Sequence, residues 1–183
     1  MTRKGGQDLG LQSRGANIRW FGKWGMLWNE LKDSVEKKIK DLPAPGLLII
    51  QLGSNNLGKR DIVVLIEDIQ RDILRIKLLL PNTRIVWSEV LMRHYWHEAN
   101  FGKAVELAPK RLNLAVKNFV LNEGHNVIRH PNIRARKKNL YRFDGTHFSD
   151  AGNAIYLNNI QGALEHFLSS DQSHIFPLES PSV

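Results

Sequence analysis

The chain has 183 residues, 42% of them hydrophobic, with a formal net charge of +8 and no cysteine. That length can bury one full core, and the absence of cysteine excludes disulfides and thiolate metal sites and favours an intracellular location. No apolar segment follows the polar start at Met1–Gly6, so we expect a soluble protein without a signal peptide or membrane span.

Apolar segments and helical stripes alternate along the chain. Residues 16–20 read as a first strand, and apolar residues spaced four apart predict a helix over 26–41. The same patterns predict strands over 47–52, 84–89 and 126–130, and helices over 61–80, 104–122 and 151–168. This alternation predicts a three-layer α/β sandwich with a parallel sheet, formed by residues 16–168. A basic, polar segment (1–15) precedes this domain, and the tail rich in Ser and Pro (169–183) is expected to be disordered.

The loop after the second predicted strand, Gly53 to Lys59, fits the G-x-x-x-x-G-K pattern of a phosphate-binding P-loop. Arg60, however, occupies the position where a P-loop needs Ser or Thr to hold magnesium. A tight strand-to-helix turn with an exposed lysine is therefore favoured over a nucleotide site.

A second motif precedes the last predicted helix. In Asp144-Gly145-Thr146-His147 a carboxylate lies three residues before an imidazole, where it can fix the tautomer of the ring and stabilise its charged form. A capped helix N-terminus would give the same local sequence. Ligands of parallel sheets bind at the carboxyl ends of the strands, and the position of the motif at that edge favours a catalytic pair.

Together these segments resemble the SGNH (GDSL-type) family of esterases and lipases. Gly53–Asn56 resembles the family's third block, Gly-x-Asn-Asp, with Asn56 in place of Asp. Asp144–His147 matches the fifth block, and Gly25 resembles the glycine of the second block. The resemblance implies a flavodoxin-like strand order and hydrolysis of a small-molecule ester through a serine acyl-enzyme, with neither metal nor organic cofactor.

The resemblance also implies a role for each matching residue. Asp144 and His147 would form the back half of a catalytic triad. The side-chain amide of Asn55 and the backbone N–H of Gly25 would stabilise the oxyanion formed when the ester carbonyl is attacked. Asn56 weakens the expected support of this loop, because an amide has only one acceptor oxygen.

The family's first block, which carries the nucleophilic serine at the end of the first strand, is absent. Residues 1–15 contain neither an apolar strand nor a Gly-Asp-Ser sequence, and neither Ser13, Ser54 nor Ser88 has the strand-end position and block order that a nucleophile needs. We expect this chain to be inactive on ordinary esters and to lack the first strand of the fold.

Two explanations stay open. The chain is either a truncated form of a longer esterase, or a degenerate relative that keeps the fold as a binding module for nucleic acid or another acidic partner. Truncation is favoured because the Asn55 loop and the Asp144–His147 motif would have little reason to coexist in a pure binder.

Other segments carry weaker signals. The basic run 133–142 has no accompanying nucleic-acid motif, so a solvated surface loop is favoured there over a nucleic-acid contact, which the net charge leaves open. His94, His97 and Glu98 could ligate a metal, but a rim segment is favoured because no fourth ligand is evident. We therefore expect no metal.

Three tryptophans, Trp20, Trp24 and Trp28, lie four residues apart around Gly25. This spacing predicts core packing, with the wall of a substrate pocket as the alternative.

Overall fold

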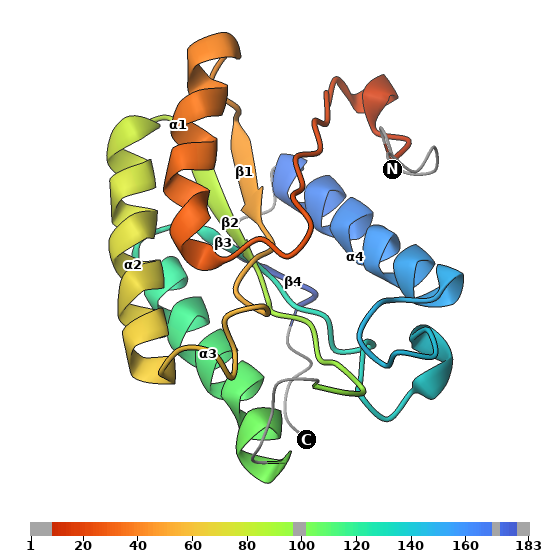
Figure 1. Ribbon diagram of the computed structural model, residues 1–183. Coiled ribbons are helices and arrows are strands. Elements are labelled where there is room, and N and C mark those ends of the chain that lie inside the picture. Colours follow the sequence, from red (N-terminus) through yellow and green to blue (C-terminus); the bar gives the residue numbers. More distant parts are fainter. Residues whose placement is uncertain (1–8, 97–101, 170–172, 179–183) are drawn as a thin grey trace.

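The structure is a computed structural model, and it describes residues 9–96, 102–169 and 173–178. A parallel sheet of four strands, in the order β1-β2-β3-β4, forms its centre (Figure 1). The strands are β1 (Leu47–Ile50), β2 (Arg84–Ser88), β3 (Asn126–Ile128) and β4 (Ile175–Phe176). Each strand is hydrogen-bonded to the next one in the order, so the sheet is continuous.

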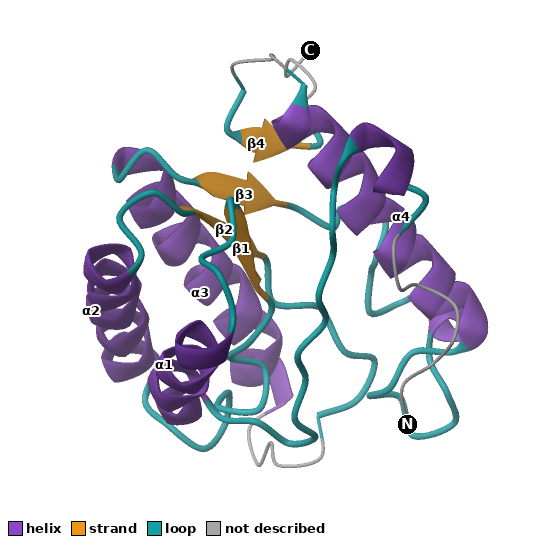
Figure 2. Ribbon diagram, turned by 90° about the horizontal axis from the view of Figure 1, so that it is seen from above, coloured by secondary structure: helices purple, strands orange, loops and turns teal. Residues whose placement is uncertain are grey.

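Helices cover both faces of this sheet. Figure 2 shows α1, α2 and α3 on one face and α4 on the other. Their bounds are α1 (Leu31–Asp41), α2 (Ile62–Leu79), α3 (Gly102–Asn122) and α4 (Asp150–Leu168). Short 3₁₀ turns span Gln12–Arg14, Trp28–Glu30 and Lys138–Leu140. The predicted three-layer α/β sandwich is confirmed.

Side chains alternate between two apolar clusters across the sheet, as the pleat requires. On β2, Trp87 enters the larger cluster, which also contains Ile69 and Ile73 of α2 and Val116 of α3. Its neighbour Val86 enters the cluster beneath α4. Both strand residues are fully buried, which explains why β2 reads as a continuous apolar run and not as an alternating one.

The first predicted strand is not formed. Residues 16–20 have no regular structure, and β1 is paired with β2 on one side and with no described strand on the other. Ala16 and Ile18 pack against the cluster beneath α4 instead. A strand needs a hydrogen-bonded neighbour, which the local apolar pattern of residues 16–20 could not guarantee.

The prediction of disorder in the tail is wrong at Ile175–Phe176, which form β4. The backbone N–H of Val127 donates to His174 O over 2.8 Å, and that of Arg129 donates to Phe176 O over 2.7 Å. The Phe176 ring packs so closely on α4 that a Cβ added to Gly162 would lie 2.8 Å from it. Across the described ranges, no helix combines the length and the apolar character that crossing a bilayer requires.

Candidate active site

The loops that follow β1, β2 and β3 lie beyond the carboxyl ends of these strands, at the lower end of the molecule in Figure 1. They comprise residues 51–61, 89–96 and 129–149. Asn55 belongs to the first loop, and Asp144 and His147 belong to the third. Since parallel α/β sheets bind ligands at this edge, the three loops are where a site is expected.

Asp144 and His147 form the closest pair among the predicted site residues. Asp144 Oδ2 lies 2.8 Å from His147 Nδ1, and Asp144 Oδ1 accepts the backbone N–H groups of His147 and Thr146, each over 2.8 Å. The His147 N–H, followed by the Thr146 N–H and the His147 ring, holds the pKa of Asp144 well below its usual range. The carboxylate is therefore ionised at neutral pH and fixes a proton on Nδ1.

The other ring nitrogen of His147, Nε2, has no hydrogen-bond partner within the described residues. With Nδ1 donating to Asp144, the neutral ring has its lone pair on Nε2. No described residue is hydrogen-bonded to Nε2, and the His147 side chain is 52% exposed. His147 is thus arranged to accept a proton from a group outside the described contacts.

The turn that holds this pair requires a glycine. Gly145 has a φ of 64°, in the left-handed region, and an added Cβ would lie only 2.8 Å from Tyr95 Cβ. Tyr95 N–H donates to Gly145 O over 2.9 Å, and Thr146 Oγ1 donates to Tyr95 O over 3.1 Å. The loop after β2 is therefore fastened to the Asp144–His147 turn.

The same loop also reaches Asn55, through Arg93. The Arg93 guanidinium donates to Asn55 Oδ1 over 2.8 Å and to Ser54 Oγ over 3.0 Å, and it lies 4.9 Å from the centre of the Trp96 ring. Because Arg93 takes the amide oxygen, the Asn55 amide nitrogen is turned the other way, where it donates to Met26 O over 3.1 Å. Within the described residues, its second hydrogen has no recorded acceptor.

Gly25 lies next to that contact. It has a φ of 68°, and no described residue accepts its backbone N–H. The structure therefore brings Gly25 and Asn55 together through Met26, and it brings Asp144 and His147 together directly. The two pairs are linked through the loop after β2, and within the described residues no hydrogen bond joins Asn55 to His147.

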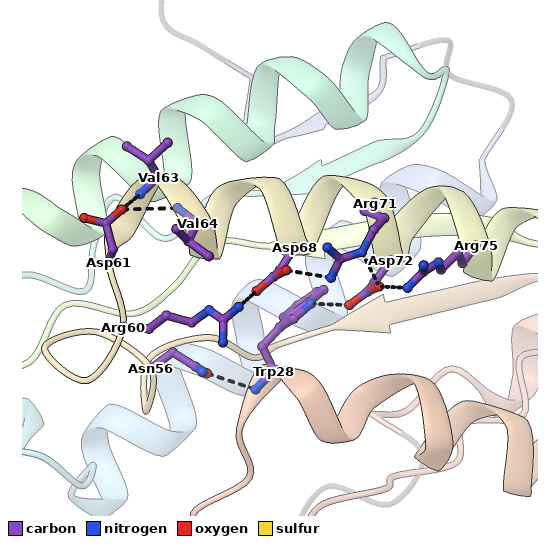
Figure 3. A network of polar contacts seen from close by, with 10 residues as sticks. All are labelled: Trp28, Asn56, Arg60, Asp61, Val63, Val64, Asp68, Arg71, Asp72 and Arg75. Carbon is purple, nitrogen blue, oxygen red and sulfur yellow. Dashed lines mark hydrogen bonds and ion pairs between the residues drawn. The ribbon is translucent and has the colours of Figure 1, made fainter.

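Asn56 supports the loop despite replacing the family's aspartate (Figure 3). Its Oδ1 accepts the backbone N–H of Trp28 over 2.9 Å, and the indole N–H of Trp28 donates to Asp72 over 3.0 Å. Arg60, the residue that argues against a P-loop, is ion-paired with Asp68 of α2. These contacts attach the Asn55 loop to α2 and to the 3₁₀ turn that begins at Trp28.

None of the three serines considered as nucleophiles is hydrogen-bonded to His147. Ser54 accepts from Arg93, and Ser13 lies exposed in a 3₁₀ turn. Ser88 is fully buried, where it donates to Gln51 and lies 2.9 Å from Nε2 of His130.

Of the three residues considered as metal ligands, only His94 lies among the described residues. His94 Nδ1 lies 3.0 Å from Ala135 O, while His97 and Glu98 fall outside the described residues. In the part of the chain that is described, no three His, Asp or Glu side chains are grouped so that they could hold a metal ion.

Core packing is confirmed for Trp28, which is 2% exposed and whose ring centre lies 6.2 Å from that of Trp87. It is wrong for Trp20 and Trp24, which are 45% and 90% exposed. Both precede α1, in a segment without regular structure that cannot turn every fourth residue toward the core.

Sequence reasoning missed Arg93, which contacts the candidate site residue Asn55. Arg93 lies in the loop after β2, the right place for a functional side chain, but nothing in the local sequence separates it from the other cations of the chain. Only its contact with Asn55 reveals it.

Compared by sequence, the chain matches no protein-family model and no curated protein. Its fold is similar to that of a GDSL-like lipase from Bacteroides thetaiotaomicron, with a TM-score of 0.68 and 16% identity over 86% of this chain and 78% of the lipase. A family 3 carbohydrate esterase from Clostridium thermocellum gives a TM-score of 0.66 and 14% identity, over 88% of this chain and 85% of the esterase. A carbohydrate esterase of family 3 from Talaromyces cellulolyticus gives a TM-score of 0.63 and 14% identity, over 84% of this chain and 75% of the esterase. The chain therefore has an SGNH-hydrolase fold.

Proposed function

We propose that the described residues supply the base and the oxyanion-binding groups of an SGNH-type ester hydrolase. The observation that carries this proposal is the Asp144–His147 pair, in which Nδ1 is held by the carboxylate while Nε2 has no described partner. The esterase and lipase folds that the chain resembles support the same class of reaction.

In the proposed reaction, His147 Nε2 takes the proton of a serine hydroxyl as its oxygen attacks an ester carbonyl. Asp144 stabilises the resulting imidazolium. The carbonyl oxygen, now negative, accepts one hydrogen bond from the side-chain amide of Asn55 and one from the backbone N–H of Gly25. His147 then returns the proton to the leaving alcohol, which leaves an acyl-serine that water hydrolyses by the same route. This chemistry needs neither a metal nor an organic cofactor.

Because Ser13, Ser54 and Ser88 are not hydrogen-bonded to His147, the proposal assigns the role of nucleophile to none of them. The nucleophilic serine would lie on a strand paired with the free edge of β1, the place where the described sheet has no neighbour. Without that strand, the chain is expected to hydrolyse short-chain esters far more slowly than a complete esterase, with water as the nucleophile.

Reaction with a fluorophosphonate probe tests this placement of the nucleophile. We expect no labelling of Ser13, Ser54 or Ser88, because none of them is hydrogen-bonded to His147. Peptide mass spectrometry that located the probe on any of the three would show that the chain carries its own nucleophile.

The oxyanion role is tested by Asn55→Ala. Loss of one oxyanion donor typically lowers the rate about a hundredfold, and enzymes without a triad can retain about a thousandfold over water, so the loss is measurable on p-nitrophenyl acetate. Asn158→Ala, on the exposed face of α4, is the matched control and should keep the parent rate. An Asn55→Ala variant that hydrolyses as fast as the parent would remove Asn55 from the mechanism.

A binding module on the same fold is the second candidate. It is favoured by the exposed cations of the segment 134–142, which form no ion pair with a described acid. If nucleic acid is the partner, its affinity should fall steeply as salt rises, and filter binding at two salt concentrations measures this. A flat, weak response would exclude it.

A further inference from the structure

Three aromatic side chains stand exposed on loops around the candidate site. Trp24 is 90% exposed, Tyr95 is 56% exposed and Phe143 is completely exposed. Trp24 directly precedes Gly25, and Phe143 directly precedes Asp144. Tyr95 is hydrogen-bonded through its backbone to the Asp144–His147 turn. Each aromatic therefore lies beside a proposed site residue, on a different loop.

Cations accompany these aromatics. The segment from Arg134 to Arg142 contains five exposed Lys and Arg side chains, and it leads directly into Phe143. Within the described residues none of the five is ion-paired with an acid: Arg134 and Arg142 donate through Nε to the carbonyls of Pro131 and Phe148. Exposed positive charge therefore lies in the segment that leads into Phe143 and the Asp144–His147 turn.

We propose that this end of the molecule binds the surface of an anionic lipid bilayer. Exposed aromatic side chains gain free energy by entering the boundary between headgroups and acyl chains, and Lys or Arg beside them are attracted to anionic headgroups. Aromatic side chains from separate loops can each enter a bilayer surface, because such binding requires no continuous groove between them. An anionic bilayer also matches the chemistry of the cations.

A single-stranded nucleic acid fits these observations less well. Such strands are bound along a cationic groove in which aromatic rings stack on successive bases. Here Trp24, Tyr95 and Phe143 come from three separate loops, while the cations come mainly from one segment. The proposal takes only the position of the site from the proposed function, since lipid binding does not require hydrolysis.

Vesicle co-sedimentation of the full 183-residue chain tests the proposal. We expect it to sediment with phosphatidylcholine vesicles that contain about 30% phosphatidylglycerol, and much less with phosphatidylcholine alone. Raising the salt from about 50 mM to about 500 mM should weaken the binding, because the Debye length shortens. Absence of binding to the anionic vesicles at low salt would overturn the proposal, whatever the chain does with esters.

Matched variants locate the surface. Phe143→Ser should weaken vesicle binding about tenfold, whereas Leu78→Ser, at the far end of α2 and 82% exposed, should leave it unchanged. Removing the charges of Lys137 and Lys138 by Gln should weaken binding about fivefold per charge. The same substitutions at Lys37 and Lys40, in the second half of α1, provide the control.

Two outcomes would refute this location or this partner. Equal losses in the control variants would show that binding follows the net charge and not this surface. In the second outcome, no variant changes sedimentation with vesicles, and the chain binds a single-stranded oligonucleotide until Lys137 and Lys138 are changed. That result would assign the surface to nucleic acid.

Discussion

Acid should destabilise the protein through one buried histidine, His130, which follows β3. It is 7% exposed, with Nε2 lying 2.9 Å from Ser88 Oγ and Nδ1 lying 3.1 Å from the side-chain nitrogen of Asn159. Its ring centre is 5.4 Å from that of Tyr156. Burial among these groups lowers the pKa of His130 from 6.5 to about 4, because a charged ring would lose its hydration there.

The size of the effect follows from that pKa. Between pH 6.5 and about 4 the unfolded chain binds a proton at His130 that the folded chain does not bind. The free energy of unfolding therefore falls as the pH falls through this window. Above pH 6.5 the stability that depends on neutral His130 is fully present. At about 1.4 kcal/mol per pH unit, the difference between 6.5 and about 4 corresponds to a loss of about 3 kcal/mol.

Urea titrations of the parent and of His130→Gln, at pH 7 and near pH 4.5, measure this loss. The glutamine keeps an amide next to Ser88 but cannot titrate, so the variant should lose about 2 to 3 kcal/mol less stability than the parent between the two pH values. His125 is also buried with a lowered pKa, and it contributes equally to both proteins. Identical pH dependence in parent and variant would refute the assignment to His130.

Two further substitutions test local features of the fold. Gly145→Ala should lower the urea midpoint more than Gly124→Ala does. Both glycines have a positive φ, but only at Gly145 would the new Cβ meet another residue, Tyr95, at 2.8 Å. Equal shifts of the midpoint would contradict this packing. Ser149→Ala should lower the free energy of unfolding by about 1 kcal/mol, since the Ser149 hydroxyl accepts the Gly152 N–H at the start of α4, and an unchanged urea midpoint would exclude that capping role.

The elements that the sequence predicts well are those whose causes are local. The apolar stripe of α2 repeats within one helix, Asp61 caps its start through the N–H groups of Val63 and Val64, and Pro81 follows its end. The predicted and observed bounds of this helix differ by one residue at each end. The Asp144–His147 contact was predictable for the same reason, because its two residues share one turn.

The features that the sequence could not predict depend on distant partners. Residues 16–20 have a strand-like pattern but are paired with no described strand, while the two residues of β4 form a strand because β3 lies beside them. Arg93 contacts Asn55 from another loop, so its importance has no local signature. Trp24 follows a helical spacing in a segment that is not helical, and it is exposed as a result.

Hydrolysis of p-nitrophenyl acetate by His147→Gln and His174→Gln tests most directly whether His147 is the base of an ester-hydrolase site. His174 is exposed beside β4, and its substitution controls for the background reactivity of surface imidazoles. We predict that the parent and His174→Gln hydrolyse the ester at the same low rate above buffer, and that His147→Gln falls to the rate of buffer alone. A His147→Gln protein that keeps the parent rate would contradict the proposed site.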